Sequence, residues 1–133
     1  MFRVTREIHF CYGHRLLHYD GKCKHLHGHN GTAVVVLEAP GLDELGMVVD
    51  FTRIKQQVGT WIDQTLDHKM ILHRDDPALP SLRQQGEPVM VMDENPTAEA
   101  IARLIYRRVK SEGFPVVEVT LWETENSCAT YSE

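Results

Sequence analysis

The chain has 133 residues, of which 42% are apolar, and this size and composition are typical of one globular domain. Its net charge of −5 argues against a broad nucleic-acid interface, and its longest apolar run, Ala33–Leu37, is too short to span a bilayer. Three cysteines with no secretory leader indicate free thiols in a reducing compartment. We therefore expect a soluble, cytoplasmic protein with a single domain over residues 1–133.

The first half of the chain is predicted to begin with two strands. Apolar residues alternate over about the first ten positions, which indicates a half-buried strand. Thr32–Glu38 is rich in β-branched residues and is predicted to be the second strand. Between them, Gly13–Gly28 contains glycines, lysines and histidines without a period, so we expect a loop there.

Two helices and two closing strands are predicted to follow. Apolar residues recur at helical spacing over Thr52–Thr65 and again over Thr97–Ser111. Asn95-Pro96-Thr97 supplies cap and first-turn residues for the second helix. Val116–Glu123 and Cys128–Tyr131 are predicted to be strands.

The order β-β-α-α-β-β favours an α+β fold with an antiparallel sheet over a doubly wound parallel sheet. Residues 74–94 have no clear assignment, because loop signals at their start give way to Val89–Met92, which could be a short edge strand.

Histidine is the most unusual feature of the composition, because six of the eight histidines fall within residues 9–29. In His27-Gly28-His29, an extended backbone would point both imidazoles to one face, where they could bind one metal ion. A catalytic zinc typically takes three protein ligands. The spacing leaves several histidines open as the third ligand: His9, His14, His18 and His25. The alternative is a set of solvated surface histidines.

Three further positions carry residues suited to proton transfer or ligand binding. Cys23 lies between two lysines, which favour its thiolate, so it could be a nucleophile, a base, a zinc ligand or an ordinary loop thiol. Asp67-His68 is a carboxylate–imidazole pair, although adjacent residues rarely pair well with each other. Glu123 ends an apolar strand, where an inward carboxylate would need a partner such as the N–H donors of a ligand.

Six ordered blocks resemble the 6-pyruvoyltetrahydropterin synthase family, which includes the 6-carboxytetrahydropterin synthases of queuosine biosynthesis. The resemblance covers residues 3–132. The blocks are Phe10-x-x-x-His14-Arg15-Leu16, Cys23-x-x-x-His27-Gly28-His29, Asp50-Phe51, Leu66-Asp67-His68, Asn95-Pro96-Thr97 and Glu123-Thr124.

The resemblance implies a tunnelling fold (T-fold), with a four-stranded antiparallel sheet and two helices on one face, and trimers that usually stack into hexamers. The implied residue roles are zinc binding by His14, His27 and His29, catalysis by Cys23, Asp67 and His68, and substrate binding by Glu123 and Thr97. In the family, the Asp–His pair reaches the cysteine across a subunit interface.

The implied reaction converts 7,8-dihydroneopterin triphosphate to 6-carboxy-5,6,7,8-tetrahydropterin, with release of acetaldehyde and triphosphate. A 6-pyruvoyl product and a non-catalytic zinc- or pterin-binding homologue are the alternatives. Two departures from the family pattern bear on the substrate. Tyr12-Gly13 stands where many members carry small residues, and the stretch between His68 and Asn95 is about a dozen residues longer than in compact bacterial members.

Overall fold

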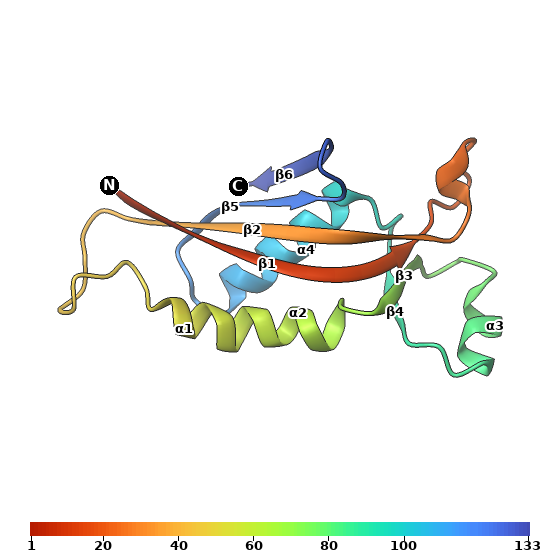
Figure 1. The fold of residues 1–133 in the computed structure, drawn as a ribbon, viewed down its shortest axis with the longest axis horizontal. Helices are drawn as coiled ribbons and strands as arrows, with labels where there is room; N and C mark the ends of the chain where they lie inside the picture. Colours follow the sequence, from red (N-terminus) through yellow and green to blue (C-terminus); the bar gives the residue numbers. More distant parts are fainter.

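The computed structural model describes all 133 residues. It consists of one curved sheet with helices along one side and a short helical segment at one end (Figure 1). In chain order, the elements are β1 (Phe2–His14), η1 (Lys22–Lys24), β2 (His27–Ala39), α1 (Phe51–Ile54), η2 (Lys55–Gly59), α2 (Thr60–Thr65), β3 (Lys69–His73), α3 (Leu79–Gln84), β4 (Val89–Met92), α4 (Ala98–Ser111), β5 (Val116–Trp122) and β6 (Cys128–Ser132).

A long antiparallel hairpin of β1 and β2 runs the length of the molecule (Figure 1). Its pairing continues without a break from Phe2 opposite Ala39 to His14 opposite His27. Even-numbered side chains of β1 face the helices, and those near its end, including His14, are buried. The predicted loop over 13–28 was therefore wrong at both ends, because the ladder continues through Gly13 and Gly28 and leaves only residues 15–26 outside the strands.

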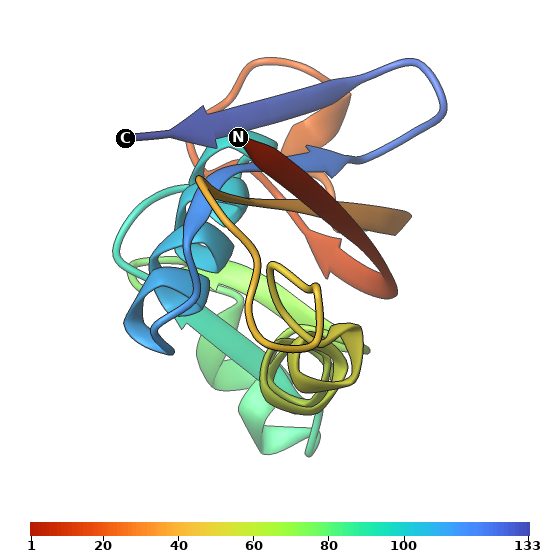
Figure 2. The ribbon, with the colours of Figure 1, turned by 90° about the vertical axis from the view of Figure 1, so that its left-hand side faces the viewer.

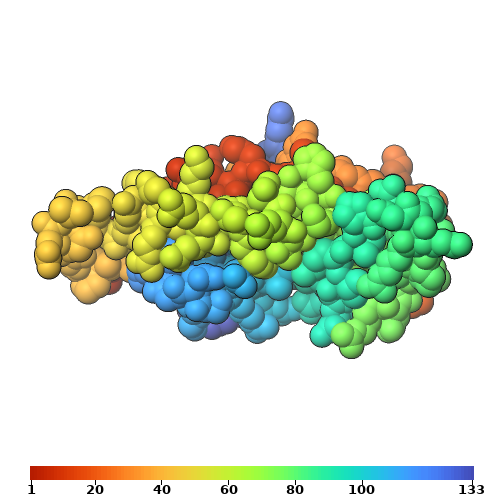
Figure 3. Space-filling model, turned by 90° about the horizontal axis from the view of Figure 1, so that it is seen from below, coloured from red at the N-terminus to blue at the C-terminus, as the bar shows by residue number.

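Two helical runs cover one face of the sheet, as the end-on view in Figure 2 and the view from below in Figure 3 show. The first is continuous over 51–65 and contains one π-helical turn, η2, between α1 and α2. The second is α4, which begins after Thr97, whose side chain accepts a hydrogen bond from the Ala100 amide. Both predicted helices are confirmed to within one residue at each end.

The core lies between this helical layer and the sheet. A single cluster of 23 buried residues joins both helical runs to β1, β2, β3, β4 and β5. No helix of the structure is long and apolar enough to cross a membrane.

The sheet has six strands rather than the four expected, in the order β4-β3-β1-β2-β5-β6. The expected antiparallel group of β1, β2, β5 and β6 is present, and β3 and β4 extend it with parallel pairing. β3 contacts β1 through only three registered pairs, Tyr12–His14 with Lys69–Ile71. β3 is too short to be recognised in the sequence by its periodicity, whereas the predicted edge strand Val89–Met92 is confirmed as β4.

Candidate metal and substrate site

Three histidines meet at the end of the β1–β2 hairpin. His14 and His27 are paired across the hairpin, and His29 lies two residues further along β2 on the same face. One ring nitrogen of each lies within 4.8 Å of the others, and the Nε2 atoms of His14 and His29 are 3.1 Å apart. The structure thus selects His14 as the third member of the group from the four candidates that spacing left open.

The chemistry of this group fits a metal ion. Nδ1 of His14 is 2.7 Å from the Pro96 carbonyl oxygen, and Nδ1 of His27 is 2.7 Å from the His25 carbonyl oxygen. A ring nitrogen that donates to a carbonyl leaves the opposite nitrogen unprotonated, as a metal ligand must be. Burial lowers the pKa of His14, which favours the same neutral form. These three imidazoles could together hold one metal ion.

Glu123 lies beside the histidines, directly after β5. Its Oε1 is 3.7 Å from Nε2 of His14 and 3.5 Å from the hydroxyl of Tyr12, which donates to it. Burial first, and the Glu123 carboxylate second, raise the pKa of Tyr12 well above its ordinary value, so the phenol stays protonated. Glu123 therefore faces inward, which the sequence left as one of two possibilities.

A small cavity of about 140 Å³ connects several of the predicted site residues. His14, Cys23, Thr97 and Glu123 all line it. Cys23 is a free, half-buried thiol on the η1 turn, and its carbonyl accepts a hydrogen bond from the Leu16 amide that closes the loop. Thr97 lines the cavity, and its hydroxyl oxygen also caps the N-terminus of α4.

Asp67 and His68 form a hydrogen-bonded pair despite being adjacent. His68 has a left-handed backbone (φ 58°), which lets its Nδ1 approach Oδ2 of Asp67 to 2.6 Å. The backbone of Cys11 holds both residues: its amide donates to Oδ1 of Asp67 at 2.9 Å, and its carbonyl accepts from the His68 amide at 2.7 Å. Although burial opposes the shift, the Cys11 amide and the His68 ring lower the pKa of Asp67, which keeps the carboxylate charged.

Within one chain, this pair does not share the cavity of Cys23. His68 instead lines a second pocket of about 450 Å³, which His27 and His29 of the histidine group also line. Its side chain is 77% exposed, so the imidazole is available to a group outside its own chain.

Comparisons with known proteins identify the family to which the chain belongs. A family model described as 6-pyruvoyl tetrahydropterin synthase matches residues 3–133. The chain belongs to this family. A 6-carboxy-5,6,7,8-tetrahydropterin synthase from Rickettsia conorii is 38% identical, with 95% of this chain and 96% of that protein covered. The enzyme of the same name from Haemophilus influenzae is 34% identical over the full length of both chains.

Solved structures agree with the family membership. An uncharacterized protein from Wolinella succinogenes superposes with a TM-score of 0.82 and 29% identity, covering 99% of this chain and 98% of that one. The 6-pyruvoyl tetrahydropterin synthase of Caenorhabditis elegans gives a TM-score of 0.73 and 25% identity, with 99% and 95% covered. The α+β fold of the 6-pyruvoyl tetrahydropterin synthase family is therefore confirmed.

Sequence reasoning did not identify two contacts that shape the site of this 6-pyruvoyl tetrahydropterin synthase family member. The first is the Pro96 carbonyl, which orients His14 while Asn95 exchanges two hydrogen bonds with the Leu17 backbone. A backbone acceptor carries no sequence signal beyond the Asn-Pro-Thr block itself.

The second is the ion pair of Arg15 with Asp76. Both oxygens of Asp76 accept hydrogen bonds from the Arg15 guanidinium, and the Asp76 side chain is fully buried. Arg15 directly follows His14, so this ion pair anchors the 74–94 segment beside the histidine group. A pairing across 61 positions could not be read from the sequence.

Proposed function

We propose that this chain is a metal-dependent lyase that converts 7,8-dihydroneopterin triphosphate to 6-carboxy-5,6,7,8-tetrahydropterin, with release of acetaldehyde and triphosphate. The observation that carries the proposal is the three-histidine group beside Glu123 and Cys23, in a chain of this family. Relatives that are 34–38% identical over nearly the whole chain are named for this product.

His14, His27 and His29 would hold the metal, which we propose to be zinc because three neutral imidazoles suit it and leave a position open for substrate. When bound, the ion would act as a Lewis acid that lowers the pKa of a side-chain hydroxyl of the substrate. The carbonyls of Pro96 and His25 would keep the His14 and His27 rings oriented toward it.

The remaining residues would bind the pterin and move its protons. Glu123 would accept hydrogen bonds from the ring N–H and amino groups, and Thr97 would add a contact at the cavity wall. The Cys23 thiolate would move protons on and off the substrate side chain, together with His68 oriented by Asp67.

Assembly would bring these groups together, because Cys23 and His68 line different cavities in one chain. We propose a trimer that can stack into a hexamer, with His68 of one copy serving Cys23 of another. Two free sheet edges support this. β3 covers only the end of β1, so Phe2–Phe10 of β1 have no neighbouring strand on that side, and β6 is the last strand of the sheet. We also propose that residues 1–133 form one domain, which the single core cluster supports. We propose that the protein is located in the reducing cytoplasm, which its three free cysteines support.

The test is turnover of 7,8-dihydroneopterin triphosphate by zinc-loaded protein, with products identified by mass spectrometry. We expect 6-carboxy-5,6,7,8-tetrahydropterin and acetaldehyde, and loss of turnover in Cys23→Ala. Cys128→Ala is the matched control, because Cys128 is a free, exposed thiol on β6 and does not line the cavity. A 6-pyruvoyl product would correct the reaction, and no turnover with metal bound would favour a non-catalytic homologue.

A further inference from the structure

Tyr12 packs against the histidine group and also contacts Glu123. Its ring stacks on Phe10 at 5.3 Å between centroids and meets His14 edge-on at 5.2 Å. The residue is only 3% exposed, and its hydroxyl points toward Oε1 of Glu123. Tyr12 is on β1 and Glu123 follows β5, with β2 between them, so the side chain crosses one whole strand.

Gly31 makes this crossing possible. It lies on β2 opposite Phe10, and a Cβ atom placed there would come within 2.9 Å of Cε1 of Tyr12. Ordinary carbon–carbon contacts lie near 3.5–4.0 Å, so any side chain at position 31 would displace the tyrosine ring. The missing side chain of Gly31 and the large one of Tyr12 are therefore complementary.

We infer that Tyr12 is a positioning residue that holds the Glu123 carboxylate toward the histidine group, through the space that Gly31 leaves open. The inference rests on the proposed function, in which Glu123 binds the pterin ring. Oε1 of Glu123 is engaged by the tyrosine, whereas Oε2 accepts no hydrogen bond within the chain and is free for the N–H donors of a ligand.

The advantage of such a contact is preorganisation. A glutamate has three rotatable bonds, and the Glu123 side chain is 24% exposed, so without a partner its carboxylate would sample several positions. Ordering it only when the ligand arrives would cost side-chain entropy and weaken binding. A single phenol hydroxyl fixed by packing on two rings removes part of that cost in advance.

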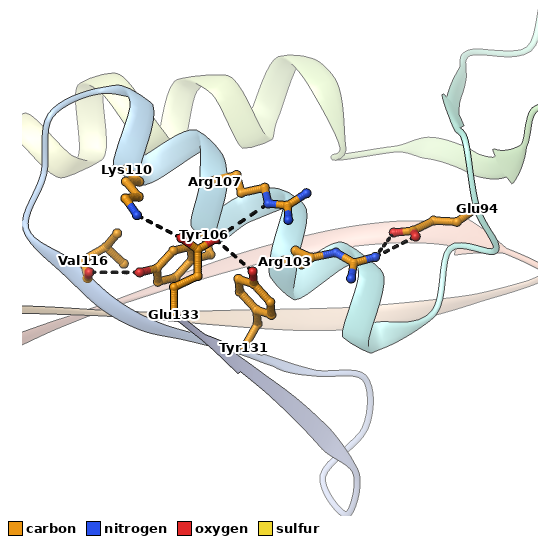
Figure 4. A network of polar contacts seen from close by, with 8 residues as sticks. All are labelled: Glu94, Arg103, Tyr106, Arg107, Lys110, Val116, Tyr131 and Glu133. Carbon is orange, nitrogen blue, oxygen red and sulfur yellow. Dashed lines mark hydrogen bonds and ion pairs between the residues drawn. The ribbon is translucent and has the colours of Figure 1, made fainter.

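The first test compares two tyrosine hydroxyls. Tyr106 is also 3% exposed and also donates over 3.5 Å, but to the carbonyl of Val116 (Figure 4), at the opposite end of β5 from Glu123. In calorimetric titrations with 7,8-dihydroneopterin, we expect Tyr12→Phe to weaken binding about threefold to tenfold and Tyr106→Phe to leave it unchanged. In turnover assays, the loss in Tyr12→Phe should fall on KM, with kcat within about twofold of wild type.

The second test alters the space rather than the hydroxyl. Gly31→Ala is expected to weaken binding at least as much as Tyr12→Phe, because the added methyl moves the whole ring. Gly41→Ala is the matched control, since nothing lies within 4 Å of a Cβ at Gly41.

The outcomes separate this inference from the function on which it rests. Wild-type protein that does not bind 7,8-dihydroneopterin would overturn the proposed function and the inference with it. If wild type binds, affinities of Tyr12→Phe or Gly31→Ala within about 1.5-fold of it would overturn the inference alone. Loss of bound metal from Tyr12→Phe would also overturn it, because the hydroxyl would then act through the histidines.

Discussion

The ion pair between Arg15 and Asp76 offers the sharpest test of how the 74–94 segment is attached. In Asp76→Ala, three hydrogen bonds to a buried carboxylate are lost: two from the Arg15 guanidinium and one from the Ala78 amide at 2.8 Å. Arg15 is 22% exposed and can regain water, so each bond contributes about 1 kcal/mol and the variant should lose about 3 kcal/mol of unfolding free energy.

Urea unfolding at pH 7 and at one fixed protein concentration measures this loss. The matched control is Asp93→Ala, because Asp93 pairs with Arg74 at 2.6 Å but both side chains are mostly exposed, at 78% and 62%. We expect the control to change stability by less than about 0.5 kcal/mol. A loss below about 1 kcal/mol in Asp76→Ala, or an equal loss in the control, would refute the buried attachment.

The pH dependence of this pair has a definite sign. The hydrogen bonds from Arg15 lower the pKa of Asp76 below its ordinary value of 3.8, so the folded state favours the charged carboxylate. The stabilisation is therefore complete above that value and is lost as the pH falls through the lowered pKa. The difference in stability between wild type and Asp76→Asn should accordingly shrink in acid, and a difference that grows below pH 4 would contradict the assignment.

Three further predictions concern the site itself. His68→Gly should abolish most turnover while changing the unfolding free energy by less than about 1 kcal/mol. Glycine adopts the left-handed backbone conformation without strain, and the lost side chain is 77% exposed. A large loss of stability in urea unfolding would argue against this. Thr97→Ala should lose about 1 kcal/mol of stability and Thr97→Ser much less, as expected for the cap of α4; equal losses would show that the hydroxyl is not the source. Metal removal with a chelator should lower the Tm of the wild type and leave the Tm of His27→Ala unchanged, since only the intact group of three histidines would bind the ion. A fall of Tm in both proteins would place the metal elsewhere.

The helices could be predicted from the sequence because the local spacing of apolar residues produces them. The helix over 98–111 carries a continuous apolar stripe and a threonine cap, and its bounds agree with the expectation to one residue. β3 is different, because five residues held by parallel partners have no pattern of their own, whereas the apolar run of β4 was recognised as a possible edge strand. The position of both strands depends on the end of β1, which is distant in the chain.

Residue types and short-range spacing were enough to identify the chemical groups of this protein and most of its helices and strands. That His14, rather than another histidine, joins His27 and His29 depends on the register of the β1–β2 hairpin, which short-range spacing does not reveal. The tertiary structure also decided that Glu123 faces inward against Tyr12. Each of these contacts joins residues on different strands, and packing rather than local preference brings them together.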